Sequence, residues 1–316
     1  TLDQLVVGRY AGGLGGSGDG VLTFEAGTST ANSVVLGDSN GSNPGLTSGT
    51  VNQNGGSLTV ANNMTLGVDG AVGTYNLAGG TLSFDDTSST TQAPIAPAST
   101  LFVNDGSAFT FSGGTLENVT TIDVALSNNS FTVGNDAGSE AIFVIGSNGV
   151  SDPDNAVRAI TTIREAGGGS GPINFQLNSD GTLAIDIFGP GSHGSNGEQG
   201  GTLTIDPLSP DLDSDLLHVS GNATLDGTLA INLNGYEPAP FHWYDVLLAD
   251  GGEINTDNLT LDGVNFVRVV DDPTDPTGTR QLLQVAVPEP ASLALWSLLS
   301  LGLAGFGYVR MRRMRY

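Results

Sequence analysis

The acidic run around Asp213 has the spacing most typical of a ligand site in this chain. Asp211, Asp213 and Asp215 form Asp-x-Asp-x-Asp, and closely spaced carboxylate oxygens are the ligands that Ca²⁺ prefers. An EF-hand loop starting at Asp211 also needs Gly at its sixth position and Glu at its twelfth, where this chain has Leu216 and Asn222. The sequence therefore favours a solvated acidic turn without a cofactor, with Ca²⁺ binding as the alternative.

Two further groups of residues invite a metal interpretation. Asp271, Asp272 and Asp275 repeat the clustered carboxylates. The three histidines of the chain are His193, His218 and His242. The last two stand about one repeat apart, so their side chains could align on neighbouring strands, but two imidazoles need a third ligand to hold a metal. We predict no metal site.

No motif in the chain identifies a catalytic centre. Cysteine is absent, as are the Gly-x-Ser-x-Gly elbow and the phosphate-binding loop. The body has no lysine and only scattered arginines, so it lacks the basic cluster that a lyase for acidic glycans needs. A carboxylate pair for glycoside hydrolysis depends on three-dimensional separation, which leaves that chemistry open. We predict a protein that is not an enzyme.

The charge balance excludes one class of partner. The chain has 33 acidic residues against 9 basic ones, all of them Arg, and a net charge of −24. Four of the arginines lie in the last seven residues, so the body is more acidic still. Such a surface repels nucleic acid. It suits an exported, soluble body.

Internal repeats predict the elements that carry these residues. Three stretches align, GTVNQNGGSLTV from Gly49, GTYNLAGGTLSF from Gly73 and SAFTFSGGTLEN from Ser107, and ANSVVLGD from Ala31 precedes ANNMTLGVD from Ala61. Apolar residues alternate within each copy and Gly interrupts every run, which predicts short strands. A unit of about 24 residues with three short strands suits one turn of a parallel β-helix, which buries its apolar side only by stacking on its neighbours. An antiparallel sandwich is the alternative.

The repeat is less regular from about residue 135. In SDPDNAVRAITTIREAG, from Ser151, the strand pattern is lost and a short helix is an alternative. Stronger alternation then returns, with the aromatic residues Phe241, Trp243 and Tyr244 together, which we interpret as core. We predict repeats over 1–134 and their irregular continuation with a C-terminal β cap over 135–286, since the end of a repeat array must be covered.

The phrases SGGTL, VVLGD, NLAGGTL and LLHVSGNATLDGTLAINL resemble the autotransporter-associated β-strand repeats of bacterial surface proteins. The resemblance covers most of residues 1–286 and implies a right-handed parallel β-helix. It offers no ligand residues.

The last thirty residues, 287–316, differ from the rest. Pro288, Glu289 and Pro290 precede 19 uncharged residues, from Ala291 to Val309. As a helix this run would be about 28 Å long, close to the thickness of a bilayer core. Four arginines follow and are expected to stay on the cytoplasmic side, which orients the body outward: Arg310, Arg312, Arg313 and Arg315. We predict a single transmembrane helix.

Val-Pro-Glu-Pro, an apolar run and an Arg-rich end resemble the PEP-CTERM sorting signal of Gram-negative bacteria. The resemblance implies exosortase as a partner, transient anchoring in the inner membrane, cleavage near Pro288 to Pro290, and delivery to the cell surface or extracellular matrix. An uncut membrane anchor is the alternative.

Together these features predict a non-catalytic structural or adhesive protein of the cell surface or exopolysaccharide matrix, as in a biofilm. The alternative is a glycan-active β-helix enzyme, a polysaccharide lyase or hydrolase. A groove with two carboxylates, lined by aromatic residues, would favour the enzyme.

Overall fold

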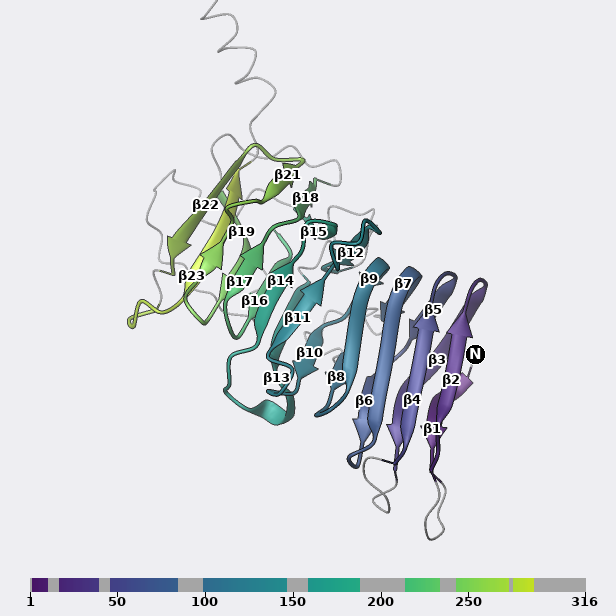
Figure 1. Ribbon diagram of the computed structural model, residues 1–316. Helices are drawn as coiled ribbons and strands as arrows, with labels where there is room; N and C mark the ends of the chain where they lie inside the picture. The colour runs from purple at the N-terminus through teal and green to yellow at the C-terminus, as the bar shows by residue number, and fades with distance from the viewer. Residues whose placement is uncertain are drawn as a thin grey trace, which may run out of the picture.

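The structure is a computed structural model of the chain (Figure 1). It describes residues 2–10, 17–39, 46–84, 99–146, 159–187, 214–233, 243–272 and 275–286. These residues form an all-β protein, with one short 3₁₀ turn, η1 (Ala166–Gly168), and no α-helix in the described ranges. Most of the strands belong to one large sheet in which parallel pairing predominates.

The strands pair in three ladders, and each ladder advances in chain order (Figure 1). The first ladder contains β1 (Leu2–Arg9), the second half of β3 (Thr28–Asp38), β6 (Met64–Val68), β8 (Thr100–Val103), β10 (Thr121–Val124), β13 (Ile160–Glu165), β16 (Leu216–Val219) and β19 (Trp243–Ala249). All of these pairings are parallel.

The second ladder is divided between two sheets. Its first part contains β2 (Gly20–Phe24), β4 (Ser48–Gln53) and the first halves of β7 (Val72–Phe84) and β9 (Ala108–Glu117). Its second part is a separate four-stranded sheet of β11 (Ser130–Val133), β14 (Asn174–Leu177), β17 (Ala223–Leu225) and β20 (Ile254–Asn255).

The third ladder contains the first half of β3, β5 (Ser57–Val60), the second halves of β7 and β9, β12 (Ala141–Val144), β15 (Gly181–Asp186), β18 (Thr228–Asn232) and β21 (Thr260–Asp262). Parallel pairing ends at β19, which pairs antiparallel with β23 (Gln281–Ala286). On its other edge β23 pairs antiparallel with β22 (Phe266–Asp271).

The three aligned repeats lie on neighbouring strands in the register that the sequence predicted. Gly49 is opposite Gly73, and Thr81 is opposite both Ser57 and Thr115. The spacing between paired strands is not constant, however, since Ile160 of β13 is paired with the distant Leu216 of β16. The loops between strands therefore absorb large differences in length.

Alternate side chains are buried in strands such as β4, β7 and β15, and buried residues from all three ladders pack into one apolar interior. An aromatic row runs through it: Tyr75, Phe109, Phe131, Phe143 and Phe175, with ring centroids 5.6 to 6.3 Å apart from each to the next. Burial of each such side chain contributes about 1.5 to 3 kcal/mol.

One polar pair lies within this interior. The Tyr75 hydroxyl donates a hydrogen bond to Oε1 of Gln53, whose amide donates to the carbonyl of Thr81 at 2.9 Å. Burial raises the pKa of the Tyr75 phenol well above its ordinary value, so the phenol stays neutral. The buried polar atoms of this pair are thereby satisfied.

Stacked glycines hold the corner between the second and third ladders. Gly56 and Gly80 have φ of +71° and +75°, a region that side chains other than Gly rarely adopt. A Cβ on Gly80 would lie 2.2 Å from the carbonyl oxygen of Gly56. This position therefore requires glycine for both its backbone conformation and its space.

The helix considered within 151–167 is wrong where the structure describes that stretch. Residues 160–165 form β13, and only Ala166–Gly168 make a 3₁₀ turn. Thr161 and Ile163 are buried while Arg164 is exposed, which is the alternation of a strand. The β-branched residues of this run favour a strand over a helix.

Within the described ranges, no helix has the length and hydropathy needed to cross a membrane. The transmembrane helix predicted for residues 291–309 lies outside those ranges.

Candidate functional site

The last described strand lies in the antiparallel end of the large sheet, called here the antiparallel sheet. β23 is between β19 and β22 (Figure 1). Its final residue, Ala286, is opposite Trp243 of β19 and Phe266 of β22. Ala286, the last described residue of the chain, therefore lies beside these two aromatic side chains.

Arg280 fixes the start of this last strand. Its Nε lies 2.9 Å from Oδ1 of Asp250, and its Nη1 lies 3.3 Å from Oδ2 of the buried Asp272. The second carboxylate oxygen of Asp250 is 2.8 Å from Nε2 of His218. The cluster joins residues from β16 and from the ends of β19, β22 and β23. It therefore adds side-chain contacts between β16 of the first ladder and the antiparallel strands.

The charge on Asp250 depends on this cluster. Partial burial opposes ionisation of its carboxyl group, but the hydrogen bond and charge of His218, together with those of Arg280, outweigh that effect. The pKa of Asp250 is therefore below its ordinary value. A carboxyl whose pKa is lowered by folding stabilises the protein above its unfolded pKa, and this contribution is lost as the pH falls through the folded pKa.

We expect Asp250→Asn to reduce the free energy of unfolding by about 1 kcal/mol at neutral pH, because the neutral amide loses the ion pair with Arg280 and the carboxylate oxygen that contacts His218. Since this variant has no carboxyl to protonate, its stability should also fall less steeply than that of the wild type below about pH 4. Urea unfolding across this pH range measures both effects. Asp257→Asn removes an exposed carboxylate with no ion pair among the described residues, and serves as the control. Equal pH profiles for Asp250→Asn and wild type would contradict the assignment.

Asp275 closes the turn before β23. Its carboxylate accepts hydrogen bonds from the hydroxyl and backbone N–H of Thr277, and from the N–H groups of Thr279 and Arg280. The bonds from Thr277, followed by those from Thr279, hold the pKa of Asp275 well below its ordinary range. This carboxylate thus stabilises the turn.

The second acidic group of the sequence does not assemble into a ligand set. Asp271 is exposed on β22, Asp272 faces Arg280, and Asp275 accepts bonds from its own turn. Across the described ranges, no group of three or more potential metal ligands is found.

Of the Asp-x-Asp-x-Asp run, only Asp215 is within the described residues, and Asp211 and Asp213 lie outside them. Asp215 is 1% exposed, and its Oδ1 accepts a hydrogen bond of 2.8 Å from the backbone N–H of Ala159. The expected solvated turn is therefore wrong for Asp215. This carboxylate joins the start of β16 to the start of β13, because burial requires such a partner.

His218 pairs with an aspartate and not with another histidine. In the register of β16 and β19 its neighbour is Leu248. His193 and His242 lie outside the described residues. Of the aromatic cluster predicted as core, Tyr244 is buried, Trp243 is partly exposed and Phe241 is not described.

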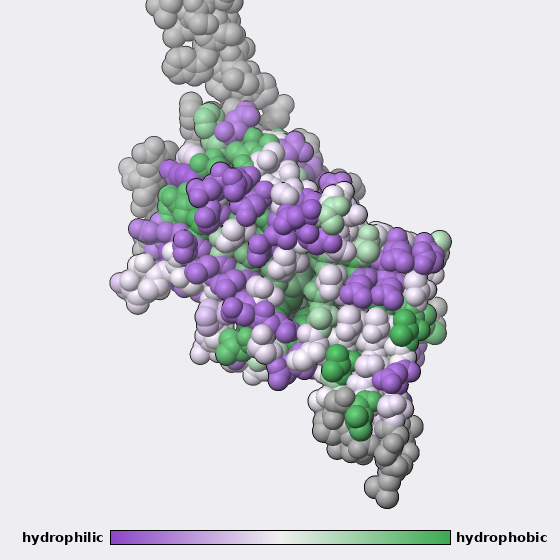
Figure 2. Space-filling model, viewed as in Figure 1, coloured by the Kyte–Doolittle hydropathy of each residue, from purple (hydrophilic) through white to green (hydrophobic). Residues whose placement is uncertain are grey.

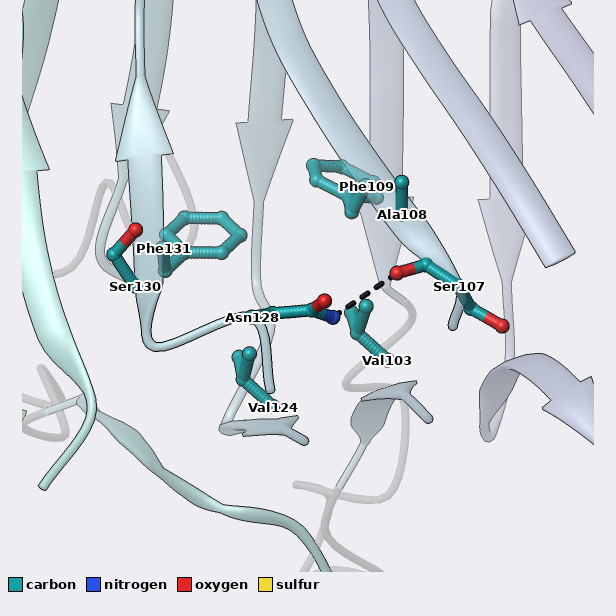
Figure 3. Close-up of a pocket in the computed structure, with 8 residues that line it drawn as sticks. All are labelled: Val103, Ser107, Ala108, Phe109, Val124, Asn128, Ser130 and Phe131. Atoms are coloured by element: carbon teal, nitrogen blue, oxygen red, sulfur yellow. Dashed lines mark hydrogen bonds between the residues drawn. The ribbon is translucent and has the colours of Figure 1, made fainter. Parts of the chain in front are cut away.

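A shallow pocket opens between β9 and β11, where the second ladder passes from one sheet to the other (Figure 3). The two strands have no ladder pairing there, and Asn128 bridges the gap by donating to the carbonyl of Ser107 at 3.0 Å. The space measures about 410 Å³, part of it open to solvent, and is lined by Val103, Ser107, Ala108, Phe109, Val124, Asn128, Ser130 and Phe131. These eight side chains carry no charge, so the pocket suits a small uncharged group.

The cluster around Arg280 was not predicted from the sequence. Its members are far apart in the chain, and no local motif joins them. One signal was available, because with so few arginines in so acidic a body each should find carboxylates. Three of the four described arginines do: Arg9 with Asp38, Arg164 with Asp123, and Arg280 with Asp250 and Asp272.

Comparison with known families identifies the segment that follows this sheet. Residues 286–313 match the family described as PEP-CTERM protein-sorting motif. The match starts at Ala286, the last residue of β23, and includes Pro288, Glu289 and Pro290 with the first three tail arginines, whereas Arg315 lies beyond it. These tail residues are outside the described ranges. No curated protein and no solved structure matches the chain.

The predicted sorting signal is thus confirmed as a motif match. It implies export, membrane-anchored sorting in Gram-negative bacteria, and recognition by exosortase.

Proposed function

We propose that this protein is an exported, non-catalytic component of the cell surface or exopolysaccharide matrix, delivered by exosortase. The sorting motif carries the proposal, because it begins where the last strand of the folded body ends. We expect this arrangement, a folded β body directly followed by a sorting signal, in a protein that exosortase delivers.

The body, in this proposal, is a right-handed parallel β-helix built from autotransporter-associated repeats. In-register parallel ladders with a shared interior support it. Residues 1–134 are the regular repeats and 135–286 the irregular continuation. The antiparallel strands β22 and β23 act as the cap, because they cover the edge of β19.

The tail, residues 287–316, acts as a transient anchor in the inner membrane. The uncharged run from Ala291 to Val309 is long enough to span the bilayer core as a helix. Arginines after it retain that end in the cytoplasm, which places the acidic body outside. Exosortase then cuts near Pro288 to Pro290 and releases the body.

The mature body contributes through its surface. Outward positions of the ladders carry Thr, Ser and Asn, and Asn76 donates to Asn52 at 2.8 Å on neighbouring strands. Such rows offer hydrogen bonds to glycan hydroxyls, and divalent cations can bridge the abundant carboxylates to acidic polysaccharide. The part of the visible face over β2 to β9 has hydrophobic residues only as separate spots (Figure 2).

The glycan-active enzyme gains no support from the pocket between β9 and β11. Phe109 and Phe131 supply the aromatic lining that an enzyme groove would need, but none of the eight lining residues is acidic. A retaining or inverting hydrolase requires two carboxyl groups across the bond that is cleaved.

Mass spectrometry of the protein from its native host tests this function. We expect the surface or matrix fraction to contain a chain that ends near Pro288 to Pro290, and an intact Tyr316 in that fraction would refute exosortase processing. Sedimentation of the mature protein with isolated exopolysaccharide tests the adhesive part separately. A mature chain that stays in the supernatant would leave the sorting intact and refute the adhesive role.

A further inference from the structure

Two aromatic side chains flank the point at which the tail leaves the body. Trp243 and Phe266 are both opposite Ala286, so all three side chains lie on the same face of the antiparallel sheet. Phe266 is 56% exposed and Trp243 is partly exposed. Hydrophobic surface gathers at the β21 and β22 end of the molecule in Figure 2.

An arginine completes this surface. Arg268 is two residues from Phe266 on β22, and therefore shares its face. Its guanidinium carbon lies 4.0 Å from the centroid of the Trp243 ring, and its Nε donates to Oε1 of Gln284 at 2.8 Å. Among the four arginines that the structure describes, it is the one without a carboxylate in an ion pair. A cation held on an aromatic ring is thus left available in a very acidic protein.

The length of chain after Ala286 fixes how far this surface can be from a bilayer. Four residues separate Ala286 from the uncharged run that starts at Ala291. Five extended steps reach at most about 17 Å. The headgroup layer on each side of the hydrocarbon core is about 5 to 8 Å thick. The sheet end is therefore within reach of the headgroups whenever the tail spans the membrane.

We propose that Trp243, Phe266 and Arg268 form a membrane contact surface that rests on the lipid headgroups while the tail anchors the protein. Tryptophan and other aromatic side chains favour the membrane interface, and the guanidinium of arginine binds phosphate. The remaining acidic surface is repelled by anionic headgroups, so this face is the one turned to the bilayer. The inference rests on the anchoring in the proposed function, and deepens it by naming the lipid-facing residues.

Tryptophan fluorescence of the full chain tests the contact. The chain has two tryptophans, Trp243 and Trp296, so Trp296→Phe leaves Trp243 as the only tryptophan. This variant is reconstituted into vesicles of phosphatidylethanolamine and phosphatidylglycerol. We expect its emission to shift to shorter wavelength relative to detergent solution, and to be quenched by lipids brominated close to the headgroup. Trp243 could instead be shielded from aqueous iodide without being quenched by brominated lipid. That result would mean that protein, and not lipid, covers the face with Trp243, and it would overturn the proposal.

Two further substitutions in the Trp296→Phe background test the neighbours of Trp243. Phe266→Ser and Arg268→Gln should each reduce quenching by brominated lipid, whereas Val21→Ser, at an exposed apolar position on β2, should not. Circular dichroism checks that all variants fold. Flotation of the vesicles measures anchoring independently. Protein that floats without lipid quenching of Trp243 refutes the contact surface alone, and protein that does not float refutes the anchoring on which it rests.

Discussion

Simultaneous replacement of Pro288, Glu289 and Pro290 by alanine is expected to leave the exported protein uncut and bound to the membrane. Proline disfavours helical structure in the residue before it and cannot donate a backbone hydrogen bond, so two prolines this close together oppose helix formation. Alanine is the best helix former. In the variant a helix of the proposed span could extend towards Ala286, and the tripeptide proposed for recognition by exosortase would be lost.

The measurement is the C-terminus and location of the protein in a host with exosortase. The wild type should accumulate as a shortened chain outside the membrane, and the triple variant as full-length chain in the membrane fraction. Pro94→Ala with Pro97→Ala removes two prolines elsewhere in the chain and should be processed normally. Normal cleavage of the triple variant would show that the tripeptide is not the recognition element.

Gly80→Ala is expected to destabilise the body by about 4 kcal/mol, a large loss for one methyl group. The new Cβ would lie 2.2 Å from the Gly56 carbonyl oxygen, which is backbone and cannot rotate away. That oxygen accepts the N–H of Thr81 at 2.9 Å, so moving it also disturbs the pairing of β5 with β7. Guanidinium unfolding followed by circular dichroism gives the change in midpoint.

Gly106→Ala is the matched control for this variant. Gly106 has the same φ of +75°, but a Cβ there meets nothing within 4 Å. Gly106→Ala should reduce the free energy of unfolding only by the cost of the left-handed backbone conformation, about 1 to 2 kcal/mol. The difference between the two variants isolates the close approach of stacked strands. Equal losses of stability in the two variants would mean that neighbouring repeats are not in close contact at Gly80.

The part of the fold that sequence predicted well is the part in which spacing is local and regular. The glycine doublets and the alternation after them placed Ser57, Thr81 and Thr115 in one row, and the structure pairs them so. The strand β13 was harder to predict, because Gly and Pro residues do not mark both of its ends. The pairing of Ile160 with Leu216 could not be predicted, since the sequence between β15 and β16 shows no repeat pattern that fixes its length.

In the candidate site, too, the features with local spacing could be predicted and the contacts between distant residues could not. Export could be predicted, because Pro-Glu-Pro, the uncharged run and the arginines are contiguous. The contacts of Arg280 with Asp250 and Asp272 depend on an antiparallel return of the chain that no motif announces. The burial of Asp215 likewise depends on β13, a distant strand.

The position of β23 between two antiparallel neighbours has a mechanical consequence. A pull on the tail acts along β23, and the hydrogen bonds to β19 and β22 run perpendicular to it. Such a load shears both rows of bonds together, whereas a strand at a free edge has only one row to resist the same load. In the proposed anchored state, fluid drag on the body would therefore be resisted where β23 joins the tail.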